Sequence, residues 1–324
     1  MKLASILLLL TACAAFAATE EQIKTNFNAA SGGSLVVDVD FGSIDVSTSA
    51  TDEVSVDVWR KVTRKDVADE EQFLHDNPVQ FLHEGDTVTV RCRQKQNKNR
   101  WFSWGSRRNQ NEGKVTVRVP ARFNARLDTS GGSIAVSDLT GKVNADTSGG
   151  GLRFTRLHGP LKGDTSGGGI GIVDCEGEIK IDTSGGGIEL TGGGGSLKGE
   201  SSGGGVIDFR GSVSVESSGG GITVENVGGK LRAETSGGPV HAVLPSPIPG
   251  DVSLESSGGG VTVQVPGDAA FNLDAESSGG GVSCDLPITI QGKKEHGELK
   301  GTVNGGGPTL KLESSGGGVH VKKL

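Results

Sequence analysis

Hydrophobic and polar residues alternate along much of the chain, and glycines interrupt the alternation at regular intervals. In one representative stretch, Val213, Val215 and Ser217 fall on one face while Ser214 and Glu216 fall on the other. A period of two residues is typical of a β-strand. The glycines that follow allow backbone turns that are closed to residues with a Cβ atom. The pattern therefore predicts short strands joined by glycine corners.

One phrase recurs ten times: an acid, Ser or Thr, Ser, two glycines, usually a third glycine, and then an aliphatic residue. The first five acids are 18 residues apart, and the ten are Asp128, Asp146, Asp164, Asp182, Glu200, Glu216, Glu234, Glu255, Glu276 and Glu313. A short fixed period indicates one supersecondary unit stacked on itself. We predict an all-β fold, a right-handed parallel β-solenoid or β-helix with two strands and two glycine corners in each coil.

Two side-chain columns follow from this stacking. The residue after each acid faces inward and is always Ser or Thr, so we expect hydroxyl to stack over hydroxyl. Two residues before the acid, on its outward face, six of the ten positions are basic: Arg126, Lys162, Lys180, Lys198, Arg232 and Lys311. We favour a ladder of solvated ion pairs over a calcium- or polymer-binding stripe, because calcium-binding solenoid turns use a Gly-Gly-x-Gly-x-Asp pattern that is missing here.

The chain divides into a leader, an N-terminal region and the repeats. Residues 18–125 form a strand-rich capping region, and residues 126–324 carry the solenoid repeats. Within the capping region we expect a hairpin over 79–92 and a short helix over 66–75, with Asp66 as its N-cap. Strands are expected at 34–40, 43–46 and 54–59. Lys322 and Lys323 would lie at the far end of the stack and discourage end-to-end pairing.

Residues 1–17 have the features of an export signal. Lys2 is the positive start, residues 3–12 are apolar, and the small residues before position 18 predict cleavage after Ala17. An alternative is a lipoprotein signal in which Cys13 is acylated. No later stretch reaches the ~20 apolar residues that span a bilayer. We expect export to the periplasm, the outer-membrane surface or the extracellular space, with a lipid anchor only if Cys13 is acylated.

Composition excludes several classes of protein. The chain has 55 glycines, no tyrosine and a net charge of −7. Removal of residues 1–17, which contain one base and no acid, leaves −8. An acidic solenoid is no partner for nucleic acid, whose proteins neutralise phosphates. Three cysteines follow the leader, Cys92, Cys175 and Cys284, and an odd number argues against a complete disulfide framework. Cys175 and Cys284 fall at inward positions and are predicted to be small buried hydrophobes.

The segment 93–114 breaks the pattern, because it is strongly basic and contains two of the three tryptophans. Such a basic-aromatic loop can stack on sugars, lie at lipid headgroups or meet an anionic polymer. Alternatively, its aromatics pack on the N-terminal sheet while the charges are solvated. The candidate ligand-binding residues are Arg100, Trp101, Phe102, Trp104, Arg107 and Arg108.

Recognised catalytic and cofactor patterns are missing from the sequence. It has no phosphate-binding loop and no histidine spacing for zinc, and its repeated serines lie in the glycine corners of the repeat and not in a nucleophile elbow. We therefore predict no catalytic residue, metal or cofactor. A carboxylate pair such as Glu189 and Asp208 leaves a polysaccharide-active β-helix enzyme as the less favoured alternative.

Residues 30–324 resemble a bacterial family of exported β-strand-repeat domains of unknown function that are labelled putative adhesins. The residues that carry the resemblance are Ser31–Leu35, Asp40–Val46, Val117–Pro120 and the Ser-Gly-Gly series. The resemblance implies an exported β-solenoid with a role at the cell surface or envelope. It supplies no catalytic residues, and the 93–114 loop is not part of it.

We therefore expect a non-enzymatic exported β-solenoid that presents an extended surface at the cell envelope for adhesion or scaffolding. The alternative function is a binding module for polysaccharide or an anionic envelope polymer that uses the basic-aromatic loop. The expected partners are a cell-surface glycan, an envelope polymer or a membrane surface. The oligomeric state stays open.

Overall fold

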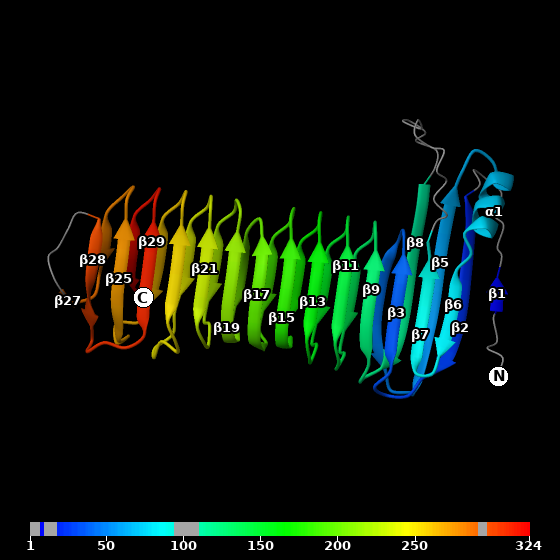
Figure 1. The fold of residues 1–324 in the computed structure, drawn as a ribbon, viewed down its shortest axis with the longest axis horizontal. Coiled ribbons are helices and arrows are strands. Elements are labelled where there is room, and N and C mark those ends of the chain that lie inside the picture. The colour runs from blue at the N-terminus through cyan, green and yellow to red at the C-terminus, as the bar shows by residue number, and fades with distance from the viewer. Residues whose placement is uncertain (1–6, 10–17, 94–109, 291–296) are drawn as a thin grey trace. The chain divides into compact units, whose positions relative to one another are not determined.

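The structure is a computed structural model that describes residues 7–9, 18–93, 110–290 and 297–324. The chain divides into two compact units, Met1–Ser166 and Gly167–Leu324, which we call unit 1 and unit 2 and describe separately. Both are built from parallel strands in two faces, A and B, to which each coil contributes one strand apiece (Figure 1). The fold is a β-solenoid, as the 18-residue period predicts.

Unit 1 stacks four complete coils. Their face-B strands are β7 (Thr87–Cys92), β3 (Ser34–Val39), β9 (Asn124–Thr129) and β11 (Val143–Thr147), and β13 (Leu161–Thr165) continues this face. Their face-A strands are β8 (Gln110–Pro120), β4 (Ser43–Ser49), β10 (Ile134–Ser137) and β12 (Leu152–Thr155). The register follows the repeat, since Asp146 lies opposite both Asp128 and Asp164. Parallel stacking thus begins before residue 126.

An antiparallel extension covers the first coil of unit 1. The strands β2 (Thr19–Asn28), β5 (Glu53–Thr63) and β8 pair in that order, and β1 (Leu7–Leu9) pairs with β2. The predicted hairpin is confirmed as β6 (Gln80–Glu84) and β7. The predicted helix is confirmed as α1 (Val67–Asp76), whose N-cap Asp66 accepts a 2.9 Å hydrogen bond from the Asp69 amide. The alternation had not indicated β2.

Unit 2 has the same architecture of two faces of parallel strands. Its face-B strands through residue 256 are β15 (Glu176–Thr183), β17 (Gly194–Ser201), β19 (Arg210–Ser217), β21 (Leu231–Thr235) and β23 (Val252–Ser256). Its face-A strands through residue 265 are β14 (Ile170–Val173), β16 (Ile188–Thr191), β18 (Gly204–Ile207), β20 (Ile222–Glu225), β22 (Val240–Val243) and β24 (Val261–Val265).

The last strands of unit 2 depart from chain order. They are β25 (Phe271–Ser277), β26 (Val282–Cys284), β27 (Ile288–Ile290), β28 (Glu298–Val303), β29 (Thr309–Ser314) and β30 (Val319–Lys323). The final coil lies between two earlier ones, because β29 pairs with β23 and β25, and β30 pairs with β24 and β26. The expectation that Lys322 and Lys323 lie at the far end is therefore wrong. Inward aliphatics at the usual spacing let this coil fit between any two others.

The inward hydroxyls form a column, as predicted, since Thr129, Thr147 and Thr165 lie opposite one another on neighbouring strands. Thr147 Oγ1 donates to the Gly132 carbonyl at 2.8 Å, and Thr235 Oγ1 donates to the Gly220 carbonyl at 2.8 Å. These two hydroxyls reach the glycine corner of the neighbouring coil, whereas Ser201 and Ser217 donate to glycine carbonyls of their own corners. The second glycine of the corner leaves no room for a side chain, since a Cβ on Gly150 would overlap the Gly132 carbonyl oxygen. These two contacts explain why Thr or Ser and Gly-Gly recur.

Candidate functional site

The basic-aromatic loop was the main sequence candidate. Its residues Arg100, Trp101, Phe102, Trp104, Arg107 and Arg108 lie outside the described residues. The described ends of the segment are tied to the fold by ion pairs. Arg93 contacts Asp38 at 2.5 Å, and Lys114 contacts Asp45 at 2.6 Å. The assignment of the loop as a ligand site stays a prediction.

The leader features also lie outside the described residues. These are Cys13 and the expected cleavage position after Ala17. Within the part of the chain that the structure describes, no helix is both long and apolar enough to cross a membrane. In the same part, no group of three or more His, Cys, Asp or Glu side chains is placed to hold a metal ion.

The outward charges of unit 1 form part of the expected ladder. Lys162 pairs with Asp164 at 2.6 Å within one strand. The strand register places Asp146 between Asp128 and Asp164 of the neighbouring strands. Asn144 stands two residues before Asp146, at the position that holds a cation in six of the ten repeats, so β11 supplies no cation to this acid. Burial, together with the charges of these two carboxylates, raises the pKa of Asp146 above its ordinary value. The acidic column therefore carries a local electrostatic cost in unit 1.

The ladder of unit 2 is made of ion pairs within single strands. Lys198 contacts Glu200 at 3.4 Å, Lys311 contacts Glu313 at 2.7 Å, and Arg232 pairs with Glu234. Lys180 differs, because it contacts Glu178 at 2.6 Å, the residue two positions before it on the same face of β15, and not the acid that follows it. The cationic side chains of these pairs are more than half exposed. Such pairs are individually weak, as the solvated ladder implies.

A groove of about 590 Å³ opens on face B of unit 2, and we call it the outer groove. It exists because small side chains replace long ones on neighbouring strands. Its hydroxyl lining comes from Ser196, Ser212, Ser214 and Ser253, and its cations are Lys230, Arg232 and Lys311. Sequence reasoning missed this groove. The available signal was the run of serines that interrupts the cationic column.

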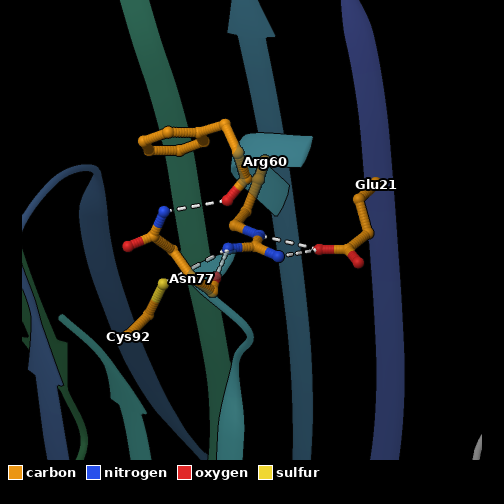
Figure 2. A network of polar contacts seen from close by, with 5 residues as sticks. Glu21, Arg60, Asn77 and Cys92 are labelled. Carbon is orange, nitrogen blue, oxygen red and sulfur yellow. Dashed lines mark hydrogen bonds and ion pairs between the residues drawn. The ribbon is translucent and has the colours of Figure 1, made fainter. Parts of the chain in front are cut away.

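A buried polar network fastens the N-terminal extension of unit 1 (Figure 2). The Arg60 side chain is 2% exposed, and its Nε donates to Glu21 Oε2 at 2.7 Å. Its Nη1 donates to the Asn77 carbonyl at 2.6 Å and contacts Cys92 Sγ at 3.4 Å. This arginine joins β5 to β2, to the end of α1 and to β7. The sequence signal was a charged residue at an inward position after Val54, Val56 and Val58.

The cysteines are free thiols in packed surroundings. Cys92 and Cys175 are buried, whereas Cys284 is only partly buried, so its predicted full burial is wrong. Cys284 lies on β26, the outermost strand of face A in unit 2, which pairs with β30 alone among the described strands. Burial raises the pKa of the Cys92 and Cys284 thiols, which favours the neutral form over the reactive thiolate.

Of the two carboxylates considered for a polysaccharide-active site, one lies within a strand and the other lies in a corner between strands. Glu189 lies on β16 opposite Gly171 and Gly205. Asp208 follows β18 with a φ of 54° and accepts a 2.9 Å hydrogen bond from Asn226 Nδ2. This bond fits a corner role, since Asn226 also has a left-handed φ.

Comparison with known proteins gives a clear result for family. No curated protein matches the chain. Among solved structures, a putative adhesin from Bacteroides fragilis NCTC 9343 is 10% identical with a TM-score of 0.33, over 94% of this chain and 97% of that one. A putative lipid binding protein from Parabacteroides distasonis ATCC 8503 is 10% identical with a TM-score of 0.31, over 93% and 96%.

These structural likenesses are too distant to carry a functional argument. The family model described as Toastrack DUF4097, in contrast, matches residues 33–322, which is most of the chain and both of its units. That span includes the complete coils of each unit, together with the capping strands β5 to β8. The chain therefore belongs to the Toastrack family DUF4097.

Proposed function

We propose that the protein is a non-enzymatic, exported β-solenoid that presents an extended surface at the cell envelope for adhesion or scaffolding. The observation that carries the proposal is the use of the repeated polar groups. In eight of the ten repeats the inward hydroxyl donates to a glycine carbonyl of a neighbouring coil, for example Thr183 to Gly168 at 2.6 Å and Ser256 to Gly238 at 2.8 Å. They serve stacking, and the outward faces are left for partners.

Export is the part of the proposal that is easiest to test. We expect the protein in the periplasmic, outer-membrane or extracellular fraction, with Ala18 as its first residue after cleavage. Mass spectrometry of the purified mature chain distinguishes this from a diacylated Cys13. A cytoplasmic protein that keeps residues 1–17 would contradict the proposal.

Adhesion and scaffolding are tested on cells. Deletion of the gene should lower attachment to surfaces or loosen envelope assemblies, and the full-length gene should restore the phenotype. A control gene encoding the same chain without residues 1–17 should not restore it, because the protein would stay inside the cell. Equal rescue by both genes would contradict a role outside the cytoplasm.

The second candidate function is binding of polysaccharide, anionic polymer or membrane surface by the basic-aromatic loop. The sequence supports it, since Trp101 and Trp104 lie among Arg100, Arg107 and Arg108. Trp101→Ala with Trp104→Ala should weaken binding to a glycan array or to anionic liposomes. Trp59→Ala is the matched control, because Trp59 is half-buried on β5. Unchanged binding in the double variant would remove the loop from consideration.

A further inference from the structure

We propose that the outer groove of unit 2 binds a linear acidic polysaccharide that lies across the strands and carries a carboxylate on alternate sugars. The inference deepens the proposed function, on which it rests, by naming a ligand class and a site. It is independent of the basic-aromatic loop. The argument uses the order of cations, the hydroxyl lining and the spacing.

The cations of face B alternate with serines across five neighbouring strands. In spatial order the residues are Lys198 on β17, Ser214 on β19, Arg232 on β21, Ser253 on β23 and Lys311 on β29. The alternation depends on the inserted final coil, because β25 would otherwise follow β23 and present Asp274 at this position. Insertion therefore places a cation where chain order would place an acid.

The spacing of these cations selects among polymers. Neighbouring strands lie about 4.7–4.9 Å apart, so cations on every second strand recur at about 9–10 Å. Carboxylates on every second sugar of an extended glycan recur at a similar spacing. An extended acidic peptide presents side chains on one face about 6.6–6.8 Å apart, which does not match. The geometry thus favours an acidic glycan over an acidic peptide.

The lining of the groove has the chemistry that an acidic glycan needs. Within the described part of the chain, no residue bonds to the hydroxyls of Ser196, Ser212, Ser214 and Ser253, and Lys230 has no ion-pair partner. These groups can pair with sugar hydroxyls and carboxylates. None of the described lining residues is aromatic, so a neutral sugar would find no stacking surface.

The ion pairs of the groove do not block such a ligand. Arg232 and Lys311 are 55% and 54% exposed, and their partners Glu234 and Glu313 lie on the same strands. Exposed pairs of this kind are weak, so each cation can turn toward a ligand carboxylate at little cost. Asp251 borders the groove, and its Oδ1 accepts a 3.0 Å hydrogen bond from the Thr309 amide.

The test measures binding of the mature full-length chain to three probes at low salt. They are a hyaluronan oligosaccharide, which has a carboxylate on alternate sugars, neutral dextran and poly-glutamate. Of the three probes, we expect only hyaluronan to bind. Added salt should weaken this binding because it screens the charge pairing. Binding of dextran or poly-glutamate as tight as that of hyaluronan, or no hyaluronan binding, would overturn the proposal.

Variants locate the site. Arg232→Ser with Lys311→Ser should weaken hyaluronan binding by at least about tenfold, since two charge-assisted contacts are lost. Lys180→Ser is the matched control, because Lys180 belongs to the same column on β15 but does not line the groove. Ser214→Gln with Ser253→Gln fills the groove without changing charge and should also weaken binding. An unchanged Arg232/Lys311 variant, or an equal loss in the control, would overturn the assignment.

The outcomes separate this proposal from the broader one. If the protein is exported and supports attachment but binds no hyaluronan, the groove is rejected as a glycan site and the proposed function still holds. A cytoplasmic protein would remove the proposed function, whatever the groove binds in solution.

Discussion

In both units the coil nearest the chain terminus is covered by another segment of the chain, but the polar contacts that hold this segment differ. In unit 1 the coil nearest the chain start, β3 and β4, is covered by the later segment β5 to β8. In unit 2 the coil nearest the chain end, β29 and β30, is covered by the earlier segment β25 to β28. Neither terminal coil is outermost in its own unit. In each unit an internal segment covers the edge of the terminal coil, and the exposed sheet edge moves to the strands of that segment, such as β6, β26 and β27.

The two covers differ in how polar groups fasten them. In unit 1, Arg60 is buried, and Glu70 is fully buried with its carboxylate accepting from the Thr19 amide and the Arg64 amide at 2.9 Å each. In unit 2, Lys300 is exposed and contacts Glu298 at 2.6 Å and Glu276 at 3.1 Å. These carboxylates raise the pKa of Lys300. The first cover is therefore fastened by buried polar bonds, and the second by a solvent-accessible cluster of ion pairs around Lys300.

Removal of residues 309–324 should have the largest effect. It takes away Leu310, Leu312, Val319 and Val321, which are fully buried and contribute roughly 6–12 kcal/mol at about 1.5–3 kcal/mol each. We expect hydrogen exchange to show lost protection in β25 to β28 while β15 to β19 keep theirs. Deletion of Leu324 alone, a 59% exposed residue, is the control. Unchanged protection in β25 to β28 would contradict the insertion.

Arg60→Met should be next in size. Loss of one member of a buried ion pair typically costs about 3–5 kcal/mol, because Glu21 keeps an uncompensated charge. Adding Glu21→Leu should recover much of the loss, since apolar replacement of both partners is often tolerated. Lys300→Met, in the exposed cluster of unit 2, should change the melting temperature little. Equal losses for Arg60→Met and Lys300→Met would erase the contrast between the two covers.

Thr147→Val tests the contact that both units share. The valine keeps the shape but leaves the Gly132 carbonyl without its donor, which should cost about 1–3 kcal/mol in urea unfolding. Thr147→Ser keeps the hydroxyl and should cost less. Ser256→Ala makes the corresponding change in unit 2, at the hydroxyl that donates to Gly238. A valine variant as stable as the serine variant would show that inward burial alone holds the coils.

Asp146→Asn should give the smallest effect, and it should be stabilising. The raised pKa means that the fold favours protonated Asp146, so its contribution is fully present at low pH and is lost as pH rises through the folded pKa. The asparagine variant should melt higher than the parent near neutral pH and equally at acid pH. The matched variant Asn144→Lys should act in the same direction by restoring a cation. A lower melting temperature at neutral pH would contradict the electrostatic cost.

The sequence by itself determined the coil. The 18-residue period, the inward hydroxyl and the glycine corners all appear in the structure, because each depends on residues within one coil and on the identical coil beside it. The helix after Asp66 and the hairpin at Gly85 were predictable for the same reason, since their signals are local. The inward Arg60 could also have been noticed, but its partners lie 39 and 32 residues away at Glu21 and Cys92.

Only the tertiary structure decided the order of the last coils and the outer groove. The strands of every coil have nearly the same hydrogen-bonding edge and the same inward aliphatics. The positions of Leu310 and Leu312 in the sequence therefore do not predict whether β29 follows β25 or lies between β23 and β25. The return of β28 along β25 settles that order. The alternation of Lys198, Arg232 and Lys311 with serines exists only after this choice, because neighbours across a sheet are set by pairing and not by position in the chain.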